Sequence, residues 1–442
     1  MMQATVVGAG LAGSEAAWQL AQRGVAVTLV EMKPQQRTPA HSADTFAELV
    51  CSNSFRSGEL TNAAGLLKEE LRRLGSLIIQ CADETRVDAG GALAVDRQAF
   101  SQQVTQRLLD HPNIRVEHRR VDAVPEEGAV VIATGPLTEG PLAQDMIRWL
   151  GEEQALSFYD AAAPIVSFAS LDMEKAYFAS RYGKGTGRDY INCPLEKEQY
   201  LAFWQALCQA EEAPVHGFED KKVFEGCMPV EVMARRGEDT LRFGPLKPIG
   251  LPDPRTGREP YAVVQLRREN EQGTMFNLVG FQTHLKFPEQ RRVFSMIPGL
   301  EQAEFLRYGV MHRNSYLCSP RVLDGFYRAK KDPRVFFAGQ MTGVEGYVES
   351  TASGFACGVN LARQLMGLPL VAFSTQTAIG ALSRHISSYE GGNFQPMNIN
   401  FGLIDPLDHR VRGKRNRYTE VSQRALAAIE ACKGQVMEGR AE

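Results

Sequence analysis

The sequence predicts an α/β protein in which a Rossmann-like domain, built from both ends of the chain, holds an inserted α+β domain. A glycine-rich turn follows a short apolar run at the N-terminus, and two later apolar runs end in glycine. Over 164–304, aromatic residues, charged residues and loops replace the alternation of strand-like and helix-like segments. The 442 residues, 44% of them hydrophobic, suffice for two such units. We therefore expect a Rossmann-like domain over 1–163 and 305–442 and an inserted substrate domain over 164–304.

The first thirty residues are typical of a βαβ unit. A strand over Thr5–Val7, the turn Gly8–Gly13, a helix over Ser14–Arg23 and a strand over Val25–Val30 follow one another directly. Glu31 then stands at the end of the second strand, about 20 residues after the turn, as the dinucleotide-binding fingerprint requires.

Each part of this unit has a physical role in binding a dinucleotide. Gly8 allows the tight turn, Gly10 lets the backbone approach a pyrophosphate, and Gly13 lets the helix pack closely on the sheet. The helix N-terminus receives the phosphate charge. A glutamate binds a ribose diol and repels a 2′-phosphate, which favours FAD or NAD over NADP. The binding residues predicted here are Gly8, Ala9, Gly10, Leu11, Ala12, Gly13 and Glu31.

Two later segments favour FAD. The run Ala129–Pro136 is a buried-strand pattern that contains Thr134 and Gly135, as found where a returning strand meets the cofactor. A second strand, Val335–Phe337, precedes Gly339 and Gln340 and a helical stretch from Ser350 with Gly354 and Gly358 on one face. Flavoproteins of the two-dinucleotide-fold class commonly have aspartate after that glycine, so the amide of Gln340 would replace it. The predicted domain is thus an FAD-binding one.

Composition excludes several other classes. The eight cysteines include no C-x-x-C pair and no cluster at zinc spacing, so we expect thiols and no metal. No early apolar stretch has the length of a signal peptide or a bilayer span, so we expect a cytoplasmic protein without a membrane partner. No sequence feature indicates an obligate protein partner, and an amphipathic helix is expected after Val421.

The net charge of −3 excludes a globally basic nucleic-acid binder but not a local basic patch. The densest run of positive charge lies near the C-terminus, and a basic pair lies in the inserted domain. Charge runs are usually solvated surface, so these residues gain meaning only if other features indicate a polyanionic partner. They are Arg410, Arg412, Lys414, Arg415 and Arg417, and Arg235 and Arg236.

Several longer segments resemble one enzyme family, the folate- and FAD-dependent tRNA uracil-5-methyltransferases. The resemblance covers nearly the whole chain, and its Cys-Ser-Asn-Ser and Tyr-Gly-Val-Met-His-Arg-Asn stretches are more specific than the glycine turn. It implies methylation of C5 of uridine 54 in the T-loop of tRNA, with carbon from 5,10-methylenetetrahydrofolate, electrons from reduced FAD, and NADPH or NADH as reductant. The segments are Val6–Ala17, Leu49–Phe55, Val263–Phe281, Met296–Asn314 and Gly343–Gly354.

This chemistry gives two cysteines a role. C5 of uracil is a poor nucleophile until a group adds to C6, and a thiolate suits that reversible addition. A base must then accept the C5 proton. The resemblance assigns the addition to Cys227, with Cys51 as the base or second thiol. Without the resemblance, either cysteine reads as a packed core residue.

The resemblance suggests further site residues. It places Tyr347 against the flavin ring and makes His312 a candidate to stack on the folate pterin, with His284 as a weaker rival. Each also fits an ordinary structural role. With tRNA as substrate, the basic run and the basic pair become candidates for phosphate contacts.

Three other functions remain open from the residues alone. A flavin oxidoreductase acting on a small molecule would not need tRNA, and a non-catalytic RNA-binding flavoprotein would hold FAD that NAD(P)H does not reduce. A related wobble-uridine-modifying flavoenzyme shares the glycine turn but has a long C-terminal helical extension that this sequence does not show.

Overall fold

The computed structural model describes residues 2–38, 40–151, 155–161, 163–213, 228–268, 273–309, 311–388, 394 and 396–440, and for 155–161 and 311–314 it describes the backbone alone.

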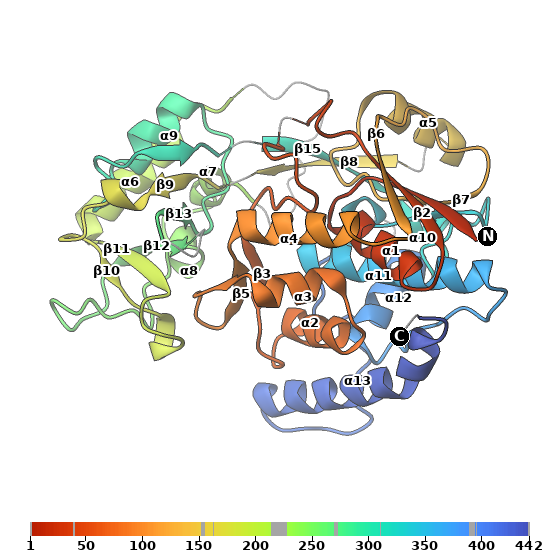
Figure 1. Ribbon diagram of the computed structural model, residues 1–442. Coiled ribbons are helices and arrows are strands. Elements are labelled where there is room, and N and C mark those ends of the chain that lie inside the picture. The colour runs from red at the N-terminus through yellow and green to blue at the C-terminus, as the bar shows by residue number, and fades with distance from the viewer. Residues whose placement is uncertain are drawn as a thin grey trace.

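A parallel five-stranded sheet forms the centre of the first domain (Figure 1). Its strands lie in the order β16-β7-β1-β2-β6. Val7 pairs with Val30 on one side and Ile132 on the other, so the carboxyl ends of three strands meet at one edge. Strands from both ends of the chain, β1 and β16, therefore belong to one sheet. The strands are β1 (Gln3–Val7), β2 (Ala26–Glu31), β6 (Ile114–His118), β7 (Ala129–Ile132) and β16 (Val335–Phe337).

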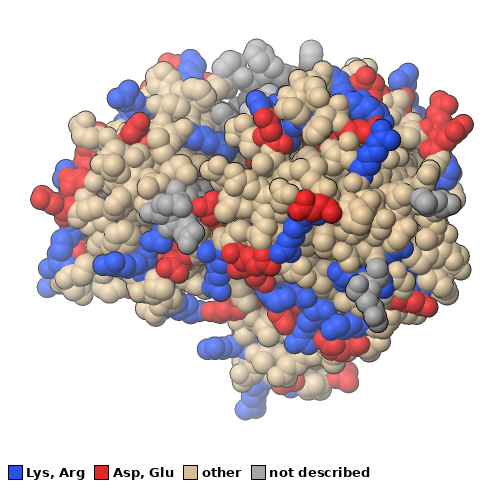
Figure 2. Space-filling model, in the orientation of Figure 1, with Lys and Arg blue, Asp and Glu red and all other residues tan. Residues whose placement is uncertain are grey.

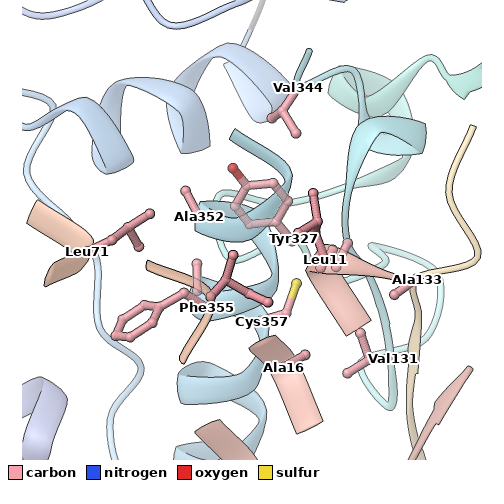
Figure 3. Packing of buried hydrophobic residues seen from close by; sticks show 14 of the residues in the cluster. Leu11, Ala16, Leu71, Val131, Ala133, Tyr327, Val344, Ala352, Phe355 and Cys357 are labelled. Carbon is pink, nitrogen blue, oxygen red and sulfur yellow. The ribbon is translucent and has the colours of Figure 1, made fainter. Parts of the chain in front are cut away.

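Two helices pack against each other beside this sheet, α1 (Leu11–Ala21) and α11 (Tyr347–Leu365). Helix α1 begins three residues before the predicted start, inside the glycine turn, where the amide of Ser14 already donates to the carbonyl of Gly10. Gly354 and Gly358 allow the close approach, because a Cβ at either would lie 2.1 Å or 2.7 Å from a carbonyl oxygen of α1. Figure 3 shows Ala16 of α1 and Cys357 of α11 among the buried side chains around this contact.

A six-stranded sheet with its own hydrophobic core forms the inserted domain. It spans 165–307, and its last strand therefore extends three residues past the expected boundary. Its strands, in sheet order, are β10 (Tyr177–Phe178), β11 (Tyr190–Leu195), β12 (Ala262–Arg268), β13 (Met275–Leu278), β9 (Ile165–Ser167) and β14 (Phe305–Arg307). Its helices are α6 (Lys197–Gln209), α7 (Val230–Arg235), α8 (Thr240–Phe243) and α9 (Phe287–Phe294), with 3-10 turns η2 (Phe168–Ser170) and η3 (Arg181–Gly183).

An antiparallel ribbon of β8 (Ala155–Ala161) and β15 (Met311–Leu317) carries the chain into and out of this domain. In Figure 1 the ribbon lies between the two larger sheets. A small three-stranded sheet consists of β3 (Ser54–Ser57), β5 (Ala92–Val95) and β4 (Arg86–Val87). In Figure 1, β3 and β5 lie next to the inserted domain, below the ribbon.

The remaining helices surround the first domain. They are α2 (Ala63–Arg73), α3 (Leu77–Glu84), α4 (Arg97–Leu109), α5 (Gly140–Leu150), α10 (Ser319–Val322), α12 (Ala378–Ser388) and α13 (Lys414–Met437), with the 3-10 turn η5 (Gln340–Thr342). The last helix starts seven residues before Val421, so part of the predicted basic run is helical. Among the helices of the described chain, none has the length and apolarity to cross a bilayer.

Candidate functional site

A cavity of about 710 Å³ opens at the carboxyl ends of β1, β2, β7 and β16. Every residue predicted to bind the dinucleotide lines it, except Gly13, which lies behind the turn. The edge where parallel strands end is the usual ligand position in such sheets. The lining residues from the predicted set are Gly8, Ala9, Gly10, Leu11, Ala12, Glu31, Thr134, Gly135, Gly339, Gln340 and Tyr347.

The glycine turn has the geometry of a phosphate-binding loop. Gly8 has a φ of +96°, and a Cβ there would lie 2.7 Å from the carbonyl oxygen of Ala133. A Cβ at Gly13 would lie 1.8 Å from the oxygen of Gly8, so the helix can follow the turn only with glycine. A Cβ at Gly10 would meet no protein atom within 4 Å. The protein thus leaves space at Gly10, where a ligand can approach the backbone.

Polar groups at this end of the cavity fit a dinucleotide. No side chain caps the N-terminus of α1, so its first amides remain available for a pyrophosphate. The Glu31 carboxylate accepts the amide of Ala9 at 2.7 Å and the amide of Lys33 at 3.0 Å. These two bonds fix the carboxylate and leave further lone pairs for a ribose diol. The residues therefore fit the adenosine diphosphate half of FAD.

In the turn after strand β16, the side chain of Gln340 donates to both carboxylate oxygens of Glu345, at 2.8 Å and 2.7 Å. Gln340 therefore lines the cavity with an amide that a neighbouring carboxylate holds in place. Its oxygen remains as the group that can meet a ligand.

Tyr347 joins this cavity to the loop that carries Cys51. The Tyr347 hydroxyl oxygen accepts the backbone amides of Cys51 at 2.9 Å and Ser52 at 3.1 Å. Burial is the main cause that raises the pKa of Tyr347, so the phenol stays protonated near neutral pH. The loop backbone is therefore held against a residue that lines the cavity.

The Cys51 loop is also tied to the inserted domain. Arg267, on β12, donates to the Asn53 side-chain oxygen at 3.0 Å and to the Ser52 hydroxyl at 2.6 Å. The side-chain nitrogen Nδ2 of Asn53 donates to the backbone carbonyl of Arg268 at 2.7 Å. In the sequence, Arg267 stands out only as one member of the basic pair Arg267 and Arg268, for which a solvated surface is the ordinary interpretation. Its tie to Asn53, 214 positions away, fixes the loop between the two domains.

Two further guanidinium groups that the sequence reasoning missed lie near Cys51. Arg97 donates to the carbonyl of Leu49 at 2.6 Å, two residues before the cysteine. Burial is the main cause that lowers the pKa of Arg307. The positive charge of nearby Arg97 lowers this pKa further, whereas the interaction with Cys51 raises it. Arg307 forms no ion pair with any residue that the structure describes. Positive charge therefore gathers around the thiol-bearing loop.

Cys227, assigned above to the attack on C6, lies outside the described residues. Described residues on either side of the segment that contains it bond to one short stretch of backbone. The amide of Ala213 donates to the carbonyl of His284 at 2.8 Å, and the amide of Val230 donates to the carbonyl of Gln282 at 2.8 Å. Ala213 and Val230, which flank the segment 214–227 in the described chain, are thus held side by side.

His284, the weaker folate candidate, lies between two carboxylates at these ends. Its ring pairs with Glu231 at 2.7 Å and with Glu212. Burial by itself lowers the pKa of His284, but pairing with Glu231 and Glu212 outweighs it and raises the pKa. With 7% exposure, His284 has a structural role here rather than an open face for a pterin. His312 lies on β15, opposite Asp160 of β8, and its side chain is outside the described part.

The predicted basic residues differ in their surroundings. Arg235 pairs with Glu212 and donates to the carbonyl of Cys208 at 3.2 Å, whereas Arg236 is the exposed C-terminal cap of α7. All five cations in the run from Arg410 to Arg417 are exposed. In the described ranges, no group of His, Cys, Asp and Glu side chains could hold a metal ion.

Comparison with known proteins agrees with this geometry. The family model described as glucose inhibited division protein A, GIDA, matches residues 3–369. A crystal structure of Aquifex aeolicus GidA superposes with a TM-score of 0.69 and 15% identity, over 99% of this chain and 75% of that one. That likeness shows the fold and confirms the predicted FAD-type α/β class.

Curated relatives match at much higher identity. The methylenetetrahydrofolate–tRNA-(uracil-5-)-methyltransferase TrmFO of Acetivibrio thermocellus is 58% identical, over 96% of this chain and 97% of its own. The enzyme of the same name from Desulfitobacterium hafniense is 59% identical over 97% and 98%, and that of Lactobacillus gasseri is 56% identical over the same shares. The family model and these near full-length matches together show that this chain belongs to the GIDA family and, within it, to the methylenetetrahydrofolate–tRNA-(uracil-5-)-methyltransferases.

Proposed function

We propose that this protein transfers the one-carbon unit of 5,10-methylenetetrahydrofolate to C5 of uridine 54 in the T-loop of tRNA, and so produces 5-methyluridine. The relatives named for this reaction support the proposal. One structural observation carries it: the hydroxyl of Tyr347, which lines the flavin-type cavity, accepts one hydrogen bond from the backbone amide of Cys51 and one from that of Ser52. A thiol and a redox cofactor would thus serve one substrate.

The residues around the cavity would hold FAD as described above, with Glu31 at the ribose and the first turn of α1 at the pyrophosphate. FAD, reduced by NADPH or NADH, supplies the electrons that convert the transferred methylene into a methyl group. We infer a cytoplasmic location, because the proposed substrate is tRNA.

The chain supplies the nucleophile and the base. In the proposed sequence the Cys227 thiolate adds to C6 of uracil, and the electron pair released to C5 attacks the methylene carbon as its bond to folate nitrogen breaks. Cys51 accepts the proton that leaves C5, and the second bond between the methylene carbon and folate nitrogen breaks. A hydride equivalent, which reduced FAD would supply, then adds to that carbon as the bond between sulfur and C6 breaks. His312 remains the proposed residue for the pterin face.

Other residues position the Cys51 loop. Arg267 and Asn53 bond the loop to β12, and Tyr347 fixes its amides. Arg97 and Arg307 place two positive charges beside it, where an anionic part of a substrate can approach. A positioned thiol reacts faster because its orientation is set before the substrate arrives.

The test is methylation of an unmodified tRNA transcript by the purified protein, with methylenetetrahydrofolate and NADPH, followed by digestion and mass spectrometry. We expect 5-methyluridine that requires the folate and is lost in Cys227→Ala. Cys432→Ala is the matched control, because this half-buried cysteine lies on α13, away from the cavity lining, and bonds only its own helix.

The alternatives give different outcomes. Full methylation by Cys227→Ala would refute the assigned nucleophile but leave the reaction standing. Flavin reduction by NADPH without any 5-methyluridine would instead favour the small-molecule oxidoreductase. Flavin that NADPH does not reduce would favour a non-catalytic RNA-binding flavoprotein.

A further inference from the structure

A second cavity, of about 830 Å³, lies between the loop before α13 and the first turns of that helix. We call it the basic groove. In Figure 1, α13 lies along the outer side of α2, remote from the strand edge that forms the flavin site. The basic groove is lined by Phe401, Asp405, Arg410, Arg412, Lys414, Arg417 and Tyr418, among others.

The cations of the basic groove lack acidic partners. Arg410, Arg412, Lys414, Arg417 and the adjoining Arg415 are all exposed, and none forms an ion pair within the described part of the chain. Acidic groups nearby are already engaged. Asp405 pairs with Arg384, and Asp408 and Glu420 both pair with His409. The five cations in eight residues therefore have no ion-pair partner in the described ranges, and the one further carboxylate near them, Glu59 beside Arg415, already pairs with Lys184.

This local excess is distinct from the general surface. Figure 2 shows Lys and Arg interspersed with Asp and Glu over the visible face, in keeping with the net charge of −3. A surface of that kind attracts no polyanion as a whole, so anion binding has to depend on a local cluster.

An aromatic pair gives the basic groove a second feature that points to nucleic acid. The rings of Phe401 and Tyr418 stack with centroids 4.0 Å apart and an interplanar angle of 19°. Lys414 and Arg417 lie over the Tyr418 ring, at 5.6 Å and 5.3 Å from its centroid. Aromatic faces combined with free cations are typical of surfaces that bind RNA backbones and unpaired bases.

Two hydrogen bonds link the segments that form the basic groove to segments that also carry Tyr347 and Cys51. The amide of Ile399, two residues before Phe401, donates to the Glu349 carboxylate at 2.9 Å, and Glu349 lies two residues after Tyr347. The Ser422 hydroxyl donates to the carbonyl of Leu60 at 2.6 Å. Leu60 follows Cys51 closely in sequence, so even a fully extended chain would separate them by only about 30 Å.

We propose that the basic groove binds the sugar–phosphate backbone of tRNA outside the loop that is methylated. The inference rests on the proposed function and adds a second contact that positions the RNA. The basic groove supplies phosphate ligands and a stacking surface, while the cavity near Cys51 receives the target base. Its loss should weaken binding without changing the chemical step.

The test compares two triple variants. Arg412→Gln, Lys414→Gln and Arg417→Gln together remove charge from the basic groove. The matched control carries Lys197→Gln, Arg258→Gln and Arg291→Gln, which neutralise three exposed cations of the inserted domain that form no ion pair with any described residue. Flavin content and circular dichroism verify that both proteins fold. Fluorescence anisotropy then measures the affinity for full-length unmodified tRNA and for an isolated T-arm hairpin over a range of KCl concentrations.

We expect the groove variant to bind full-length tRNA at least tenfold more weakly than the control. Its plot of log affinity against log salt should have a slope smaller by about 2, since each phosphate contact contributes about 0.7–0.9. Affinity for the T-arm hairpin should be unchanged, and methylation should show a higher KM with the same kcat.

Several results would overturn the proposal. Equal losses in both triple variants would show a general charge effect, and unchanged tRNA affinity in the groove variant would exclude the contact. Competition by polyglutamate as strong as that by RNA would indicate an acidic protein instead. Groove-dependent tRNA binding by an enzyme that makes no 5-methyluridine would refute the proposed function but retain this site.

Discussion

Replacing Gly354 by alanine should destabilise the fold and weaken flavin binding together. A Cβ at Gly354 would lie 2.1 Å from the carbonyl oxygen of Ala12 and 2.8 Å from its Cα atom. Both are backbone atoms, so no side chain can rotate away. Helix α11 would have to move from α1 by about 1 Å to restore an ordinary contact. Because Ala12 belongs to the glycine turn, that movement also displaces the turn that lines the flavin cavity.

The size of the effect follows from two opposing contributions. Alanine is favoured over glycine inside a helix by about 1 kcal/mol. Overpacking of a tight contact costs typically about 1–3 kcal/mol, and a backbone contact of this kind belongs at the upper end. The free energy of unfolding should therefore fall by about 2 kcal/mol in Gly354→Ala.

Gly434→Ala is the matched control, because Gly434 also lies inside a helix, α13, but a Cβ there would meet nothing within 4 Å. That variant should gain up to about 1 kcal/mol. Urea unfolding followed by circular dichroism measures the stabilities, and flavin absorbance after dialysis measures retention of the cofactor. A Gly354→Ala protein as stable as the control, with full flavin content, would refute the reasoning from helix contact.

Three further predictions concern single side chains. Glu31→Ala leaves the amide of Ala9 without its acceptor and should weaken FAD binding by about 1–3 kcal/mol, as a flavin fluorescence titration would show; unchanged affinity would exclude Glu31 from the site. Tyr347→Phe removes the acceptor for the amide of Cys51 and should lower the methylation rate about tenfold or more while flavin content is retained; an unchanged rate would mean that the loop needs no such tie. Because the pKa of His284 is raised in the folded state, its protonation contributes to the free energy of unfolding. This contribution is fully present below the pKa of the unfolded state, about 6.5, and is lost as pH rises through the higher pKa of the folded state. The urea midpoint of the wild type should therefore fall between pH 6 and pH 8.5, His284→Gln should lack this component, and parallel pH profiles would contradict it.

The sequence by itself determined the FAD-type sheet and the half of the site that lies within one βαβ unit. Gly8, Gly13 and Glu31 could be predicted because their roles depend on strand, turn and helix geometry within about thirty consecutive residues. The returning strands at Thr134 and Gly339 followed from the rule that parallel strands end at one edge. The spacing of Gly354 and Gly358 placed both on one face of a helix, and the structure shows that this face packs against α1.

The tertiary structure alone decided how the two domains meet. Arg267 reads as one member of a solvated basic pair, yet it is 9% exposed and bonds Asn53 across 214 positions. Nothing periodic in the sequence relates such residues, because a single long-range hydrogen bond leaves no repeating pattern. The same holds for Arg307 beside Cys51 and for His284 between two glutamates. Local backbone geometry is encoded in consecutive residues, whereas these pairings arise only when distant segments are packed together.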